Sequence, residues 1–125
     1  MISKSPIVSY CIHDDHWHLA SSIRSFALIG KVVCFVSRTA WDGSAGDWER
    51  VAAIAEREGA EVVLGDWPDE QLHRKSALAA LRSRGCQFVV TPDSDEVIEP
   101  ALAEALGGGE VVLKLSQTYV ALSAR

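Results

Sequence analysis

The chain has 125 residues, of which 48% are hydrophobic and 23% charged, so its composition excludes a low-complexity disordered protein and fits one compact domain. A net charge of -5 argues against a general nucleic-acid binder or a protein of anionic membrane surfaces. No apolar run approaches the ~18 residues that span a bilayer, and residues 1–6 lack the apolar core of a signal peptide. We therefore expect a cytoplasmic protein, in which Cys11, Cys34 and Cys86 are free thiols beside apolar runs.

Five short apolar runs predict strands, with helical segments between them. The runs are continuous rather than alternating, a pattern typical of strands that are covered on both faces in a mostly parallel sheet. They lie at residues 7–12, 32–36, 62–64, 88–90 and 111–115.

Four helices are predicted between these strands. The first runs from about His16 to Gly30, with Asp14 or Asp15 as its N-cap. The others start near Asp47, at Pro68 and at Pro100, and the glycines at 59, 85 and 107–109 mark their ends. This order predicts one α/β domain over residues 1–125: a doubly wound, Rossmann-like, mostly parallel five-stranded sheet with helices on both faces.

Acidic residues follow the predicted strands. Asp14 and Asp15 follow the first, Asp42 the second and Asp66 the third, while the acidic sequence at 93–96 follows the fourth. In parallel α/β sheets ligands bind beyond the carboxyl ends of the strands. We therefore expect these carboxylates to converge on one edge of the sheet.

Asp93 and Asp95 form the sharpest of these motifs, a DxD followed by Glu96. If the chain stays extended there, both side chains project to the same side, about 6 to 7 Å apart, and can aim at one centre. Hard oxygen ligands suit Mg²⁺ or Mn²⁺, and such a cation can bridge a diphosphate. The other interpretation from the residues alone is a solvated acidic turn that caps the next helix.

The order of these motifs resembles the family-2 glycosyltransferases of the GT-A fold. The resemblance covers the chain from Pro6 to about Leu106, and the DxD with its following Glu is its most specific part. The segments that carry it are Pro6-Ile7-Val8-Ser9, Ser22-Ile23-Arg24-Ser25, Trp41-Asp42-Gly43, Gly65-Asp66-Trp67, Arg74 and Pro92-Asp93-Ser94-Asp95-Glu96.

The resemblance implies a GT-A-like domain that binds a nucleotide-diphospho-sugar donor. It implies that Asp93 and Asp95 hold Mg²⁺ or Mn²⁺ with the diphosphate, and that Arg74 approaches the phosphates. Asp14 or Asp15, with Asp42, would contact base and ribose. The family's acceptor-binding half would follow the donor half, whereas only residues 107–125 remain here. We expect a transferase domain that lacks this half and is inactive without it.

A response-regulator receiver domain is a second interpretation. Receivers place an acidic pair, a phosphoaccepting Asp, a hydroxyl and a lysine after successive strands. Asp14, Asp15, Asp66, Thr91 and Lys114 occur in that order, which predicts phosphorylation on Asp66. A non-catalytic α/β module is the third interpretation.

Two further expectations concern association and aromatic residues. If the run at 111–115 forms an edge strand, its exposed backbone and apolar groups favour a homo-oligomer. Trp41 and Trp67 adjoin loops at the proposed ligand edge, where each either stacks on a nucleobase or packs in the core, while Trp48 is expected to pack a helix.

Overall fold

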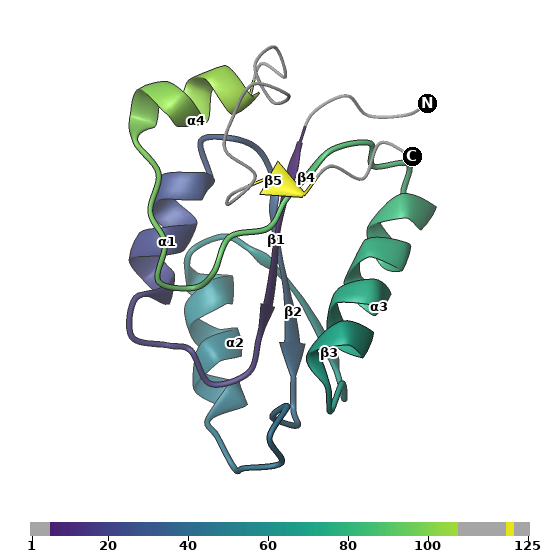
Figure 1. Ribbon diagram of the computed structural model, residues 1–125. Coiled ribbons are helices and arrows are strands. Elements are labelled where there is room, and N and C mark those ends of the chain that lie inside the picture. Colours follow the sequence, from purple (N-terminus) through teal and green to yellow (C-terminus); the bar gives the residue numbers. More distant parts are fainter. Residues whose placement is uncertain (1–5, 108–119, 122–125) are drawn as a thin grey trace.

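The computed structural model describes residues 6–107 and 120–121. Four parallel strands form the main part of its sheet, and helices pack beside them (Figure 1). The α/β class predicted from the sequence is confirmed. In chain order the elements are β1 (Ile7–Ile12), α1 (Leu19–Phe26), β2 (Val32–Ser37), α2 (Trp48–Arg57), β3 (Glu61–Gly65), α3 (Glu70–Ser83), β4 (Val89–Val90), α4 (Pro100–Gly107) and β5 (Val120–Ala121).

The strand order is β3-β2-β1-β4-β5, and it reverses direction beside β1. The chain first moves outward from β1 to β2 and β3, and α3 then carries it back to β4 on the other side of β1. The first four strands are parallel, whereas the two residues of β5 pair antiparallel with β4. The strand predicted at 111–115 lies outside the described residues.

Two layers of apolar side chains cover the two faces of the sheet. Tyr10 and Cys34 belong to a cluster that includes residues of α1 and α2, whereas Phe35 joins Ala77 and Leu81 of α3 on the opposite face. Figure 1 shows α1 and α2 on one side of the sheet and α3 on the other. All six residues of β2 are buried, because helices lie on both sides of it. This burial explains why the apolar run of β2 is continuous.

Aspartate caps begin both α2, near the predicted start at Asp47, and α3. Asp47 accepts a hydrogen bond from the backbone N–H of Arg50 (3.1 Å), and Asp69 accepts one from that of Leu72 (3.0 Å). Gly59 and Gly85 follow these helices with φ of 86° and 82°, a conformation that glycine adopts without steric cost. The predicted start of the third helix at Pro68 is two residues too early, because α3 begins at Glu70 after its N-cap Asp69.

The first helix starts later than predicted. It begins at Leu19 rather than His16, and His18 occupies the N-cap position without a side-chain bond. The predicted cap by Asp14 or Asp15 is therefore wrong. Asp14 instead accepts a hydrogen bond from the backbone N–H of Asp47 (2.8 Å), a contact between two loops that are far apart in the sequence.

The three cysteines are free, as predicted: Cys34 and Cys86 are buried and Cys11 is partly buried. Across residues 6–107 and 120–121, no helix combines the length and the apolar character that crossing a membrane requires.

Candidate functional site

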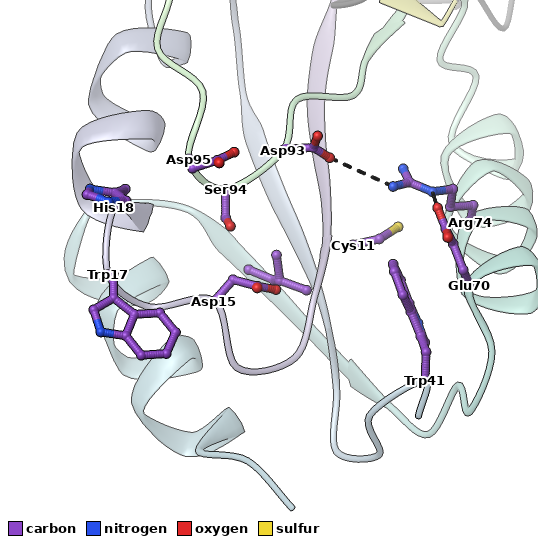
Figure 2. A pocket seen from close by; sticks show the side chains of 11 residues that line it. Cys11, Asp15, Trp17, His18, Trp41, Glu70, Arg74, Asp93, Ser94 and Asp95 are labelled. Atoms are coloured by element: carbon purple, nitrogen blue, oxygen red, sulfur yellow. Dashed lines mark hydrogen bonds and ion pairs between the residues drawn. The ribbon is translucent and has the colours of Figure 1, made fainter. Parts of the chain in front are cut away.

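A cavity of about 540 Å³ opens where the strand order reverses, between the carboxyl ends of β1 and β4 (Figure 2). In open α/β sheets, ligands bind beyond the carboxyl ends of the strands, at the point where the strand order reverses. Its lining comes from the end of β1, the loops after β1, β2 and β4, and helix α3. The lining residues are Cys11, Ile12, Asp15, Trp17, His18, Trp41, Glu70, Arg74, Asp93, Ser94 and Asp95.

A second cavity of about 330 Å³ adjoins the first on the side of β2. The two share Asp15 and Trp41, among other residues, so the Trp41 indole forms part of the wall of both. Asp14 and Asp42 line the second cavity. Apart from Asp66 and Glu96, the carboxylates expected to meet at one edge are divided between these two neighbouring cavities, with Asp15 common to both.

The DxD segment forms a tight turn and is not extended. The N–H of Glu96 donates to the carbonyl of Asp93 (3.0 Å), and the Glu96 carboxylate accepts from the Asp93 N–H (2.7 Å). The sequence-based geometry, with both carboxylates projecting from an extended strand, is therefore wrong. Asp93 and Asp95 nevertheless both line the first cavity, with Ser94 between them (Figure 2).

Two serines of α1 form hydrogen bonds with the backbone of the DxD turn and of the segment that follows it. Tyr10 and Ser22, both fully buried, share a hydrogen bond between their hydroxyls (2.7 Å), and Ser22 also makes a long one to the carbonyl of Asp93 (3.5 Å). Ser25 accepts a hydrogen bond from the N–H of Ile98 (3.1 Å). Sequence reasoning missed this support, although two serines three residues apart among apolar helix residues are a recognisable signal.

Arg74 is the cation of the first cavity. Its Nε donates to Glu70 (2.9 Å) one helical turn earlier, and its other end lies 3.9 Å from the Asp93 carboxylate. The guanidinium also lies 5.9 Å from the centre of the Trp41 ring, within the range of a cation–π contact. Arg74 therefore lies beside Asp93 of the DxD segment.

Part of the acceptor capacity of Asp14 and Asp42 is already used within the protein. Asp14 accepts the backbone N–H of Asp47, and Asp42 accepts that of Ser44 (2.9 Å). The hydrogen bonds from Ser44 hold the pKa of Asp42 below its ordinary value. Asp42 therefore remains a carboxylate anion at neutral pH.

The Cys11 thiol also lines the cavities, but it is a poor nucleophile. Burial, which disfavours the thiolate, raises its pKa to about 11. Cys11 is therefore protonated at neutral pH.

Trp41 and Trp67, for which the sequence allows either base stacking or core packing, have different surroundings in the structure. Trp67 is partly buried and packs with Phe35 in the core layer under α3, so the packing interpretation describes it. Trp41 is 40% exposed and lines both cavities. Trp48 packs against the core, as expected.

No group of three His, Cys, Asp or Glu side chains in the described ranges is placed to bind a metal ion on its own. A cation at Asp93 and Asp95 would need further ligands from a bound molecule or from water.

Asp66 lines neither of the two cavities. Its carboxylate accepts hydrogen bonds from Arg38 (3.2 Å) and from the hydroxyl of Thr39 (3.3 Å).

In comparisons with known proteins, no family model matches the chain and no curated protein gives a significant match. The geometry of the two cavities and the motifs around them therefore carry the functional interpretation.

Proposed function

We propose that this chain is a GT-A-like domain, doubly wound and five-stranded, which binds a nucleotide-diphospho-sugar for transfer of the sugar to an acceptor. One observation carries the proposal: the cavity at the reversal point of the sheet brings Arg74, Asp93 and Asp95 together with Asp15. Phosphate groups suit this cavity because Arg74 supplies a positive charge and several N–H donors.

The division into two cavities supports a matching division of the donor. The diphosphate and sugar occupy the first cavity, near Arg74 and the DxD turn, while base and ribose occupy the second, near Asp14, Asp15 and Asp42. Carboxylates are good acceptors for ribose hydroxyls and for N–H groups of a base.

The donor set at the DxD turn fits Mg²⁺ or Mn²⁺. Asp93 and Asp95 offer only oxygen ligands, and Mg²⁺ in proteins is often held by one or two carboxylates together with substrate phosphates and water. When bound, the cation would stabilise the charge that develops on the departing diphosphate.

The proposed activity also requires a binding site for the acceptor, and we assign the acceptor to neither of the two cavities. We also propose a cytoplasmic location, which three unpaired cysteines support, because thiols are kept reduced there. Association of two copies of the chain is also part of the proposal.

The observed strand order weakens the receiver alternative. Receivers use the order 2-1-3-4-5, which puts the third strand beside the first. Here β2 separates β3 from β1, and Asp66 after β3 lines neither of the two cavities that hold Asp14 and Asp15. A non-catalytic module has no specific observation in its favour.

Calorimetric titration with UDP-glucose and GDP-mannose, each with and without Mn²⁺, tests the proposal. We expect Mn²⁺-dependent binding of at least one of them, and its loss in the variant that combines Asp93→Asn and Asp95→Asn. Asp66→Asn is the matched control, since it removes an exposed strand-end carboxylate outside the cavities. Unchanged affinity in the double variant contradicts the proposal. A response to beryllofluoride with Mg²⁺ that Asp66→Asn abolishes supports the receiver instead.

A further inference from the structure

His73 is a buried polar residue for which the proposed function provides no role. It lies in the first half of α3 and is fully buried, next to the cavity-lining Arg74. Its ring lies between two tryptophans: it stacks on Trp67 with centroids 4.7 Å apart, and it meets the edge of Trp41 at 5.7 Å.

Hydrogen bonds use both nitrogens of the His73 ring. The indole N–H of Trp41 lies 3.1 Å from Nδ1, and the carbonyl oxygen of Phe35 lies 2.7 Å from Nε2. An indole nitrogen can only donate and a carbonyl can only accept, so Nδ1 accepts and Nε2 carries the hydrogen. The two partners together select one tautomer of a neutral imidazole.

The Trp41 indole links His73 to the ligand cavities. Its N–H edge is held by His73, while its exposed part lines both cavities and its ring lies near the Arg74 guanidinium. The loop that carries Trp41 has no other side-chain hydrogen bond to α3 among the described residues. The bond to His73 is therefore the polar contact that fixes this ring relative to the helix of Arg74.

We propose that His73 is a positioning residue, which holds Trp41 as a fixed wall between the two cavities and thereby controls binding of the nucleotide diphosphate without touching it. This inference rests on the proposed function for the identity of the ligand. The role of His73 in holding Trp41 does not depend on that identity. A freely rotating indole would have to be ordered when the ligand binds, at a cost in affinity.

Two substitutions separate the two hydrogen bonds of His73. In His73→Asn the short amide can place an oxygen near the position of Nδ1 and keep an acceptor for Trp41, but it does not reach Phe35. In His73→Gln the longer amide can place its NH₂ near Nε2 and keep the bond to Phe35, but it offers no acceptor to Trp41. Each variant loses one buried hydrogen bond, so similar losses of stability are expected.

The indole N–H signals of the tryptophans in a ¹H–¹⁵N NMR spectrum give the first readout, without any ligand. The signal that disappears in Trp41→Phe belongs to Trp41. We expect this signal to exchange slowly with solvent in the natural sequence and in His73→Asn, and rapidly in His73→Gln. Equal exchange in all three overturns the positioning role. Trp41→Phe changes a partly exposed side chain and leaves His73 in place. The assignment of the signal therefore does not depend on a substitution of the buried histidine.

Binding of UDP with Mn²⁺ gives the second readout. We expect His73→Gln to raise Kd about tenfold and His73→Asn to change it much less. In a Trp41→Phe background, the same His73→Gln change is expected to have no further effect. An equal loss in both backgrounds overturns the inference. If the natural sequence binds neither UDP nor the nucleotide sugars, the proposed function fails, while the NMR result still decides whether His73 holds Trp41.

Discussion

The guanidinium of Arg74 and the carboxylate of Asp93 face each other at 3.9 Å in the lining of the first cavity. Arg74 comes from α3, on one face of the sheet, and Asp93 from the turn after β4. The pair is close enough for attraction but too long for a direct hydrogen bond. Because Glu70 occupies only the Nε end of Arg74, N–H groups near Asp93 remain able to bind a phosphate oxygen.

Arg74→Met is expected to weaken binding of UDP with Mn²⁺ about tenfold, because a charge-assisted contact to phosphate is lost. The free energy of unfolding should change by less than about 1 kcal/mol, since partly exposed ion pairs contribute little. Calorimetry and urea unfolding measure the two effects. Lys75→Met is the matched control, because it removes a neighbouring exposed charge that does not line the cavity. Equal affinities for the two variants contradict the role of Arg74.

Ser22→Ala is expected to lower the free energy of unfolding by about 1–3 kcal/mol, because it leaves the buried hydroxyl of Tyr10 without its partner. The combined variant with Tyr10→Phe should lose less than the sum of the two single changes, since it removes both hydroxyls. Urea unfolding measures all four proteins. Ser21→Ala, an exposed position on the same helix, should change stability by less than about 0.5 kcal/mol. Strict additivity would contradict the pairing of Tyr10 with Ser22.

The sequence predicts most of the described elements because their signals are local. Continuous apolar runs mark the strands, and Asp47 and Asp69 are caps whose partners lie three residues away. The order of strands in the sheet is not local. It depends on the side of β1 to which the chain returns after α3. The cavity forms because β4 pairs with β1 on the side opposite to β2.

The errors in the sequence-based interpretation involve contacts between distant segments. Asp14 does not cap α1, because it binds the N–H of Asp47, 33 residues away. The DxD segment is bent by Glu96, and Ser22 of α1 contacts the bend. His73 was not recognised, because its role requires Trp41 and Phe35 on two other segments. No periodicity or spacing in the sequence reports such contacts.

Gly30→Ala is expected to lower the free energy of unfolding by about 1–3 kcal/mol. A Cβ atom at Gly30 would collide with the backbone carbonyl oxygen of Pro6, and the chain there is also fixed by a hydrogen bond from Val8 N–H to the carbonyl of Lys31 (2.8 Å). Neither backbone can move aside without disturbing the pairing of β1 with β2. Urea unfolding tests this, and Gly30→Ser should cost at least as much because it adds the same Cβ. A midpoint unchanged by Gly30→Ala would show that the segment around Pro6 yields easily.

Glu61 is expected to make stability depend on pH in the acid range. Arg84 binds its carboxylate through two nitrogens (2.9 and 2.6 Å) and Lys31 lies at 2.8 Å, which together lower the pKa of Glu61 to about 2. The folded chain therefore binds fewer protons than the unfolded chain, in which the pKa is near 4.5. The stabilisation is present above pH 4.5 and is lost as the pH falls toward 2.

Urea unfolding at several pH values between 7 and 2.5 measures this contribution in Glu61→Gln and in the natural sequence. The variant should be less stable at pH 7 by about 1 kcal/mol, because solvent screens a carboxylate that is 32% exposed. The difference should shrink steadily below pH 4.5, since protonation removes the same charge from the natural protein. Glu56→Gln, on the exposed surface of α2, controls for the loss of one negative charge. A difference that stays constant down to pH 2.5 would show that the carboxylate of Glu61 gains no stability from Arg84 and Lys31.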